Sequence, residues 1–489
     1  MRILLCQPAS NIMKNRKEGK PALQPLGLAY IAGTLIANGF KDVQILDVLT
    51  EGYYNETPFK KDYIRYGLSP KEIKKRIKEF NPDIVGVSCI NHIRQYHALE
   101  ICELAKEVNK NIVTVVGGNP ITCEPKWFLK REYVDFAILG EGEQPFLKLI
   151  KSQQRNTGIT IWDIDGIAFK DQFDKSGYTI KPQKVWRKDI DNIPFPAHHL
   201  LQLDKHLEIW NKEGYHYYPA KKFTSMVMSR GCPNFCEHCP HNVLFPGYRP
   251  RSAKNVFDEV KFVYEKLGVE EVQFHEYNGI VVWKIVEDFC KLMIESGLNK
   301  KVMWGWPIGI WLKALNYDKL KLMREAGMFY VDLAIESANQ ELLNNLMKGK
   351  DVDLDHTMNV IKWSRELGYY INCFFMLGLE GQTKEDIEST IKFSSELDVD
   401  TIAYFIAQPL PKTPFWDYCV KNDLFIDGFD KFHLRYGKSN IKINGITPKE
   451  LEHYRHKARE DFVNYWKNHG RKPYEGKRGK DFLLKRGCE

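Results

Sequence analysis

Short apolar segments alternate with amphipathic helical patterns in two separate stretches of this chain. In the first stretch the apolar segments are residues 2–6, 43–48, 83–89, 111–116 and 135–139, and helical spacing of apolar side chains marks residues 26–38, 70–80 and 97–108. In the second stretch the apolar segments are residues 224–229, 271–275, 302–306, 330–336, 370–377 and 401–407, and helical patterns mark residues 256–267, 285–296, 317–326, 356–367 and 384–397. This alternation predicts parallel sheets joined by helical crossovers.

We therefore predict an α/β chain with two βα-rich parts. Residues 1–155 are expected to form a doubly wound, Rossmann-like parallel sheet, and residues 221–420 a partial (β/α)6 barrel. Residues 156–220 read as a linker that carries a small hairpin and, at residues 193–197, a stiff proline-containing segment. Residues 421–489 are expected to form a helical, basic C-terminal region.

The strongest chemical signal is a cluster of three cysteines directly after the first apolar segment of the second stretch. Cys232, Cys236 and Cys239 have the spacing C-x3-C-x2-C, which places three thiolates on one tight loop. Three thiolates hold three irons of a [4Fe-4S] cluster and leave the fourth iron open for another ligand. A zinc site with His238 or His241 as fourth ligand is the alternative. The other eight cysteines are scattered singly and are expected to be packing residues.

Charge and hydropathy restrict the partners of the chain. The formal net charge is +8, and much of this excess lies in residues 471–486. We expect a solvated end there rather than a nucleic-acid site. The N-terminus lacks the features of a signal peptide, and no apolar stretch reaches about 18 residues, so we expect no membrane span. Cysteines without paired spacings fit a reducing, cytoplasmic location.

The cysteine segment also resembles a known family. Residues 229–240, Ser-Arg-Gly-Cys-Pro-Asn-Phe-Cys-Glu-His-Cys-Pro, resemble the cluster motif of radical S-adenosylmethionine (radical SAM) enzymes, and residues 248–252 resemble the turn that follows it in the cobalamin-binding branch. In that family the open iron chelates the amino and carboxylate groups of SAM, which electron transfer cleaves to a deoxyadenosyl radical. The resemblance implies that Cys232, Cys236 and Cys239 are the cluster ligands and the catalytic centre.

The resemblance assigns further residues of the barrel to SAM. Phe235 is expected to pack against the adenine, with a plain core position as the alternative. Glu276 is expected to accept a hydrogen bond from the SAM amino group, with a solvated loop carboxylate as the alternative. Glu336 and Ser337 resemble the "Ile-Glu-Ser" strand end that contacts the ribose.

Later strand ends complete the expected pocket. Gly378 and Gln408 match positions that line the adenine and substrate side in the family. Trp304 and Trp306 lie two residues apart on one predicted strand and therefore point to one face. They either line the substrate or corrin pocket or fill an aromatic core.

The first stretch resembles the cobalamin-binding domain that precedes many radical SAM barrels. The resemblance lies in residues 25–30, 116–118 and 139–143. Ligands of such sheets sit beyond the carboxyl ends of the strands, where glycines allow close approach. The expected cofactor-binding residues are Gln7, Pro8, Gly117, Gly118, Asn119, Gly140, Glu141 and Gly142.

One departure from cobalamin domains concerns the lower face of cobalt. Many of them carry Asp-x-His-x-x-Gly after the first strand, but residues 7–13 contain no histidine. We therefore expect cobalamin without a lower histidine ligand. His92 and His97, which follow the third strand, are expected to be surface or rim residues.

The resemblance implies an enzyme that transfers a methyl group from SAM, via methylcobalamin, to an unactivated carbon or to phosphinate phosphorus. Two alternatives remain open: a non-methylating reaction such as ring closure, ring contraction or oxidation, and a cobalamin or cluster sensor without catalysis. The implied cofactors are a [4Fe-4S] cluster, SAM and cobalamin. The implied partners are a small-molecule or peptide substrate and an electron donor such as flavodoxin or ferredoxin.

Overall fold

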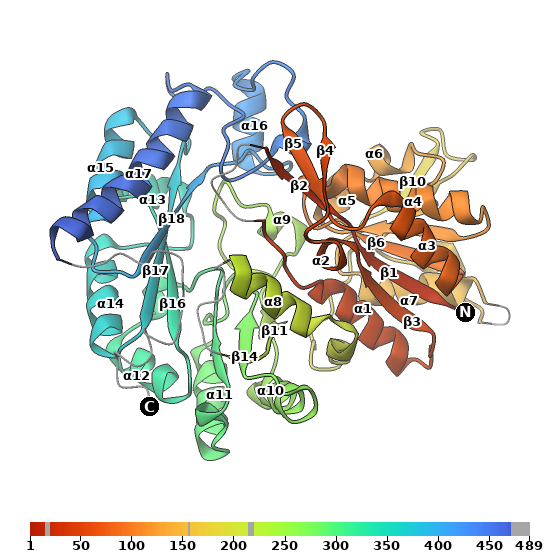
Figure 1. Cartoon of the computed structure of the whole chain (residues 1–489), viewed down its shortest axis with the longest axis horizontal. Coiled ribbons are helices and arrows are strands. Elements are labelled where there is room, and N and C mark those ends of the chain that lie inside the picture. Colours follow the sequence, from red (N-terminus) through yellow and green to blue (C-terminus); the bar gives the residue numbers. More distant parts are fainter. Residues whose placement is uncertain (15–19, 155–156, 214–219, 471–489) are drawn as a thin grey trace. The chain divides into compact units, whose positions relative to one another are not determined.

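The structure is a computed structural model, and it describes residues 1–14, 20–154, 157–213 and 220–470. The chain divides into two compact units, Met1–Glu213 and Gly214–Glu489, which we describe separately (Figure 1). The basic tail that the sequence singles out, residues 471–489, lies outside the described residues. Within the described ranges, no helix combines the length and the apolar character that crossing a membrane requires.

The first unit is built on a seven-stranded sheet with the order β10-β9-β8-β7-β6-β1-β3. Its five parallel strands are β1 (Ile3–Gln7), β3 (Val43–Asp47), β6 (Ile84–Ser88), β7 (Val113–Gly117) and β8 (Phe136–Ile138). The chain places β3 on one side of β1 and β6 on the other, so the switch in strand order lies between β1 and β6. All five predicted strands are confirmed to within two residues at either end.

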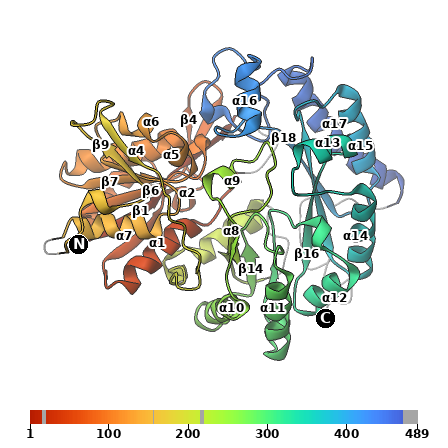
Figure 2. The same ribbon diagram turned by 180° about the vertical axis from the view of Figure 1, so that it is seen from behind.

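Both faces of this sheet are covered by helices (Figure 2). One face packs on α1 (Leu26–Ala37) and α7 (Glu143–Ser152), and the other on α3 (Pro70–Phe80) and α4 (Gln95–Val108). The central strand β1 shows the alternation: Ile3 and Leu5 belong to the first core, and Leu4 and Cys6 to the second. A strand buried on both faces reads as a continuous apolar run, and the doubly wound fold is confirmed.

A hairpin extends the parallel sheet, and a separate small sheet accompanies it. The predicted hairpin is present as β9 (Ile167–Lys170) and β10 (Tyr178–Lys181), and β9 pairs antiparallel with β8. A second, antiparallel sheet of β2 (Ser10–Met13), β5 (Tyr63–Tyr66) and β4 (Glu56–Phe59) was not predicted. Its edge strand β4 is polar and contains Pro58, which edge strands tolerate. Short helices α2 (Val48–Glu51), α5 (Asn119–Cys123), α6 (Pro125–Leu129) and α8 (Leu203–Glu213) complete the unit.

The predicted stiff segment at residues 193–197 packs against α1. The Ala197 N–H donates to the carbonyl oxygen of Ala29 at 2.9 Å. A Cβ atom on Gly33 would lie 2.2 Å from the carbonyl oxygen of Phe195. Glycine at position 33 is therefore required by the close approach of this segment to the helix.

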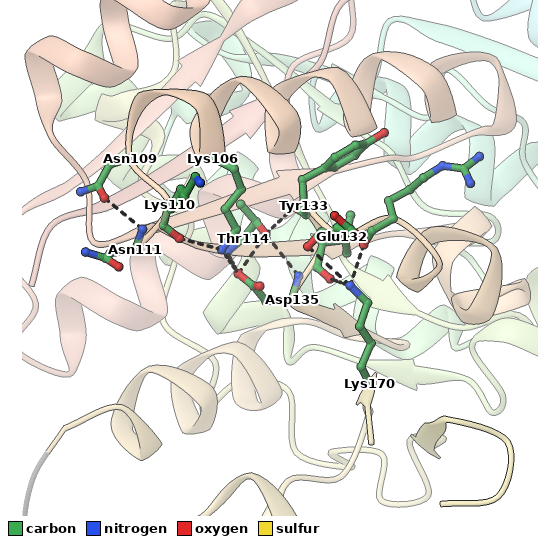
Figure 3. Close-up of polar contacts among 11 residues, drawn as sticks. Lys106, Asn109, Lys110, Asn111, Thr114, Glu132, Tyr133, Asp135 and Lys170 are labelled. Carbon is green, nitrogen blue, oxygen red and sulfur yellow. Dashed lines mark hydrogen bonds and ion pairs between the residues drawn. The ribbon is translucent and has the colours of Figure 1, made fainter. Parts of the chain in front are cut away.

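A polar cluster closes the amino-terminal edge of the sheet, opposite the edge expected to bind a ligand (Figure 3). Asp135 accepts hydrogen bonds from the backbone N–H of Thr114 at 2.8 Å and from the ammonium of Lys106 at 2.6 Å. Lys170 donates to the carbonyl oxygens of residues 131 and 134 at 2.7 and 3.2 Å. These contacts fix the turn before β8, and they are made within the chain's own backbone and side chains.

The second unit contains six parallel strands in chain order (Figure 1). One sheet holds β11 (Phe223–Met226), β14 (Glu271–Phe274) and β15 (Met303–Gly305), and the other β16 (Tyr330–Glu336), β17 (Tyr370–Leu377) and β18 (Thr401–Ile406). Parallel bridges from Trp304 to Met328 and from Ile310 to Leu333 join the two sheets. The predicted partial barrel of six βα units is confirmed.

Helices separate these strands as expected. They are α10 (Ala253–Leu267), α11 (Trp283–Glu295), α12 (Tyr317–Glu325), α13 (Gln340–Leu346), α14 (Leu354–Glu366) and α15 (Lys384–Ser395). Side-chain caps begin several of them, such as Ser252 for α10 and a capping box from Thr383 for α15.

The C-terminal region is only partly helical. It contains α16 (Pro414–Lys421) and α17 (Pro448–Asn468), and residues 422–447 between them are largely irregular. Helix α17 lies beside α15 and β18 (Figure 1). The Arg455 side chain on α17 donates to the carbonyl oxygen of Tyr404 in β18 at 2.7 Å, which ties the helix to the last barrel strand.

Candidate active site

The three cysteines of the motif lie on one loop at the carboxyl end of the first barrel strand. After β11 the chain forms β12 (Ser229–Arg230), which pairs antiparallel with β13 (Arg249–Pro250). We call residues 231–240 between them the cluster loop; α9 (His241–Leu244) follows it. Gly231 has φ +79°, and a Cβ atom there would lie 1.8 Å from the carbonyl oxygen of Gly247. The base of the loop is thus closed by a contact that only glycine permits.

The thiols of the cluster loop are partly buried. Burial raises the pKa of Cys232, of Cys236 to about 12, and of Cys239 to about 11, while the positive charge of Lys350 opposes each shift. The thiolate forms therefore require a compensating positive charge, which bound iron would supply. Among residues 1–14, 20–154, 157–213 and 220–470, no three His, Cys, Asp or Glu side chains converge as ligands of a single metal ion. A zinc site needs its ligands to converge on a single ion. A [4Fe-4S] cluster instead separates its three thiolates by its own iron and sulfide atoms.

Two neighbours of the cysteines differ from expectation. The Phe235 side chain is 64% exposed, so the alternative of a plain core position is wrong; its contact with adenine stays a prediction. His238, directly before Cys239, is half-buried, and desolvation lowers its pKa. Its Nδ1 atom has no hydrogen-bond partner in the part of the chain that the structure describes. The sequence motif contained this histidine, but we considered it only as a zinc ligand.

Glu276 follows β14 and is buried, so the solvated-loop alternative is wrong. It accepts a hydrogen bond from the Trp306 indole N–H at 2.6 Å and another from the backbone N–H of Met228. Burial raises its pKa to about 7, although these donors act in the opposite direction. The carboxylate therefore connects the backbone before the cluster loop, at Met228, with Trp306, which directly follows β15. Both of its oxygens already accept a hydrogen bond.

The two predicted tryptophans belong to a buried aromatic cluster. Trp304 and Trp306 are both fully buried, and their rings contact each other edge to face with centroids 5.3 Å apart. Both rings also pack against Phe274. Of the two alternatives, the aromatic core is confirmed.

Glu336 and Ser337 lie at the carboxyl end of β16, where the resemblance placed a ribose contact. Glu336 has φ +73°, and the register between β16 and β17 shifts at this point. Such a conformation is costly for a residue with a side chain and occurs mainly at functional sites. Its carboxylate accepts a hydrogen bond from the Lys350 ammonium at 2.6 Å. The Ser337 hydroxyl accepts one from the Asn339 N–H at 3.1 Å.

The last two predicted barrel residues contact the C-terminal region. Gly378 has φ +80°, and a Cβ atom there would lie 3.1 Å from the side chain of Leu451 in α17. Gln408 is buried, donates to the carbonyl oxygen of Lys438 at 2.9 Å and accepts from the Asn440 amide at 3.1 Å. Both residues therefore position the C-terminal region, and their contact with a cofactor stays a prediction.

The C-terminal region also brings a residue that sequence reasoning missed. Tyr436 stacks edge to face on Phe405 of β18, with centroids 5.5 Å apart. Its side chain is 54% exposed, and partial desolvation, Cys239 and Glu336 raise the pKa of its hydroxyl above the ordinary value. A phenol from residues 422–447 thus lies within electrostatic range of the cluster loop. No local motif marks it, since its position depends on a long-range return of the chain.

In the first unit the predicted cofactor residues do gather at the carboxyl edge of the sheet. Gln7 ends β1, and Gly117 ends β7 just before Gly118 and Asn119. The Gln7 amide already donates to Asp47 and to the carbonyl oxygen of Leu23, both at 3.0 Å. Pro8 follows Gln7 directly.

The glycines at this edge serve the chain's own packing. A Cβ atom on Gly118, at φ +119°, would lie 2.1 Å from the carbonyl oxygen of Cys89. One on Gly140 would lie 2.2 Å from the Gln183 side chain, and one on Gly142 would lie 3.0 Å from Ile31. The Glu141 N–H donates to Gln183 at 2.7 Å. Only at Gly117 would a Cβ atom meet nothing nearer than 3.7 Å, so this glycine leaves the most room for a ligand.

The segment after β6 carries buried polar groups. His92 and His97 are both buried, so of the expected surface or rim positions the surface is wrong, and the rim of the sheet stays a prediction. His97 shares a hydrogen bond of 3.2 Å with Asn11. Arg94 is also buried, and its Nε and Nη1 atoms lack a hydrogen-bond partner in the described residues. Two nitrogens of a buried guanidinium without acceptors are costly, so they mark this edge as a place for an added acceptor. Sequence reasoning missed Arg94, although it follows a strand at the switch point.

Two family models match the chain. The B12 binding domain matches residues 18–150, and the radical SAM superfamily matches residues 226–394. The first match lies in the unit with the doubly wound sheet, and the second runs from β11 to α15 of the barrel. The chain therefore belongs to the cobalamin-binding radical SAM enzymes.

Known proteins resemble the chain over most of its length. Cytidylyl-2-hydroxyethylphosphonate methyltransferase of Streptomyces wedmorensis is 29% identical and covers 91% of this chain and 86% of its own. Anaerobic magnesium-protoporphyrin IX monomethyl ester cyclase of Cereibacter sphaeroides is 27% identical and covers 92% and 68%.

A solved structure shares the fold. The radical SAM methyltransferase TsrM of Kitasatospora setae, solved with cobalamin and a [4Fe-4S] cluster, matches with a TM-score of 0.70 at 15% identity and covers 95% of this chain and 89% of its own. TsrM has also been solved with tryptophan substrate and a SAM analogue.

Proposed function

We propose that this cobalamin-dependent radical SAM enzyme is a methyltransferase. The observation that carries the proposal is the loop with Cys232, Cys236 and Cys239 at the carboxyl end of β11, in a chain that also has a B12-binding domain. The methyltransferase relative at 29% identity supports methyl transfer as the outcome of the radical step.

The residues present fit the proposed cofactors. Three thiols on a loop with a glycine-closed base suit three irons of a [4Fe-4S] cluster. At the carboxyl edge of the first sheet, Gly117 leaves room and Arg94 presents N–H groups that lack acceptors among the described residues. When bound, the cluster with SAM supplies a carbon radical and the corrinoid supplies the methyl group.

Several side chains have proposed roles around SAM. Glu336 presents a carboxylate at a strand end, where it suits ribose hydroxyls, and Ser337 lies beside it. The exposed ring of Phe235 is available to the adenine. Glu276 acts as a positioning residue in this proposal, because its oxygens already bind Trp306 and the backbone of Met228.

The substrate proposed is a small molecule. Proteins that resemble the chain in sequence or fold act on cytidylyl-2-hydroxyethylphosphonate, a magnesium porphyrin ester and tryptophan, which are all small molecules but differ in chemistry. Reduction of the cluster requires a low-potential one-electron donor, for which flavodoxin and ferredoxin are the protein classes to test.

The experiment uses full-length protein purified anaerobically and reconstituted with iron, sulfide and hydroxocobalamin. After addition of SAM and reductant, bound cobalamin is measured by absorbance and products by mass spectrometry. We expect retained cobalamin and formation of both deoxyadenosine and S-adenosylhomocysteine. Cys236→Ala is expected to abolish deoxyadenosine formation, while Cys102→Ala, which removes a buried thiol of α4, should preserve it. Deoxyadenosine formed equally by Cys236→Ala would refute the assignment of the cluster loop.

A second candidate is a non-methylating radical reaction, which the cyclase relative favours. The product assay separates the two functions once a substrate is found. Deoxyadenosine without S-adenosylhomocysteine during turnover, with the cobalamin methyl state unchanged, would support this second candidate. No SAM cleavage at all by a reduced, cluster-loaded protein would favour a sensor.

A further inference from the structure

A short segment after α13 braces the cluster loop. We call residues 346–350 the bracing segment. The backbone N–H of Phe235 donates to the carbonyl oxygen of Lys348 at 2.7 Å, and that of Glu237 donates to the carbonyl oxygen of Leu346 at 3.0 Å. A Cβ atom on Gly349 would lie 3.6 Å from the Cα atom of Asn234. The segment therefore runs alongside the cluster loop in the manner of a paired strand.

The bracing segment carries two lysines in different environments. Lys348 pairs with Glu237 at 2.5 Å, and its side chain is 59% exposed. Lys350 pairs with Glu336 at 2.6 Å, and the side chains are only 12% and 10% exposed. An exposed pair is screened by water and contributes little, whereas a buried ammonium acts on its surroundings at low effective dielectric.

The buried ammonium lies beside the cluster loop. The backbone bonds from Phe235 and Glu237 to the bracing segment flank Cys236, and Lys350 ends that segment. Glu336 holds the ammonium there at 2.6 Å, with both side chains largely shielded from water. A charge in this place is poorly screened, so it acts on the charge that the cluster loop carries.

We propose that Lys350 sets the reduction potential of the cluster that Cys232, Cys236 and Cys239 hold. The proposal rests on the proposed function, since it requires that cluster. Reduction adds one electron, taken from a low-potential donor such as flavodoxin or ferredoxin, to a site that already carries three thiolates. A fixed positive charge stabilises the reduced state more than the oxidised state and so raises the potential. Glu336 acts in the opposite direction, because its carboxylate adds negative charge at the same place.

The opposed charges of this pair give a test that a purely structural ion pair would fail. Lys350→Met removes the cation and leaves the carboxylate, so the potential should fall. Glu336→Gln removes the carboxylate and leaves the cation, so the potential should rise. Lys350→Arg keeps the charge and should retain a potential close to that of the unchanged protein. Lys313→Met is the matched control, because Lys313 pairs with Asp351 at 2.7 Å where both side chains are more than half exposed.

The measurement is a redox titration of the full-length, cluster-loaded protein with titanium(III) citrate, without SAM, followed by electron paramagnetic resonance. At a fixed applied potential near the midpoint, we expect Lys350→Met to reduce the ratio of reduced to oxidised cluster at least tenfold, which corresponds to a downward shift of about 59 mV or more for one electron. Lys313→Met should leave the ratio unchanged. Iron and sulfide content are measured in every variant.

Shifts of equal sign in Lys350→Met and Glu336→Gln, or no shift in either, would overturn the proposal. If Lys350→Met does not retain iron, the upward shift in Glu336→Gln and the unchanged potential in Lys350→Arg still decide it. Absence of the cluster, on which the proposed function depends, is a distinct outcome, because the unchanged protein would then hold no iron or sulfide to titrate. A cluster that binds but whose potential ignores these substitutions would refute only the role of Lys350.

Discussion

At the scale of single residues, the buried carboxylate of Glu276 makes stability depend on pH. Burial is the main cause that raises its pKa to about 7, from an ordinary value of 4.5. Between these values the folded state holds a proton that the unfolded state releases. The contribution of Glu276 to the free energy of unfolding is therefore largest below pH 4.5 and is lost as the pH rises to about 7.

The variant Glu276→Gln tests whether ionisation of this carboxylate lowers the free energy of unfolding as the pH rises. Between pH 4.5 and 7.5 the unchanged protein should lose on the order of 3 kcal/mol more free energy of unfolding than the variant, because the glutamine does not titrate. Urea unfolding at the two pH values, followed by tryptophan fluorescence, measures the difference. Equal losses in both proteins would show that the carboxylate is ionised throughout. Gly279 belongs to the same arrangement, since a Cβ atom there would lie 2.2 Å from the Trp306 indole nitrogen.

The sequence predicted the chemical groups of the site better than the partners to which those groups bond. The cysteine spacing alone predicts the cluster loop, because its three cysteines lie within eight residues of one another. The partners of Glu276, Gln7 and Gln408 could not be predicted, since each bonds to a segment distant in sequence. Lys350 was missed for the same reason: nothing near it in the chain indicates that it faces Glu336.

At the scale of secondary-structure elements, prediction succeeded where burial is complete. The barrel strands β16 and β17 have the predicted bounds, because long apolar runs end there at polar or glycine residues. The sheet of β2, β5 and β4 was missed, because its strands have four residues each and the Glu-Thr-Pro-Phe sequence of β4 has no apolar alternation. Strands of this kind are defined by their pairing rather than by their own pattern.

The hairpin of β9 and β10 yields a prediction at this scale. Lys170 at the end of β9 donates to carbonyl oxygens of the turn at residues 131–134, and Lys170→Met removes these bonds (Figure 3). The bond to residue 131 is exposed and the bond to residue 134 is half-buried, so their loss should cost about 0.5–1.5 kcal/mol. We expect faster amide hydrogen exchange in residues 131–138, measured by mass spectrometry. Lys175→Met, in the exposed turn of the same hairpin, is the control. Unchanged exchange in Lys170→Met would mean that the turn holds without this lysine.

At the scale of the whole molecule, the chain joins a doubly wound sheet and a six-stranded partial barrel, each with its expected site at the carboxyl ends of its strands. This division was predictable, because both folds produce the same alternation of apolar strands and amphipathic helices and differ in the residues at the strand ends. The C-terminal region was not predictable to the same degree. Its contribution, through Tyr436 and α17, depends on how residues 422–468 return to β18.

The central claim is that Cys232, Cys236 and Cys239 hold a cluster with one iron open to SAM. The most direct measurement is electron paramagnetic resonance of the reconstituted, reduced protein before and after addition of SAM. We predict the signal of a reduced [4Fe-4S] cluster whose g-values change when SAM is added, and loss of the signal in the variant with all three cysteines replaced by alanine. A cluster signal that SAM leaves unchanged, or one that persists in the triple variant, would contradict the account.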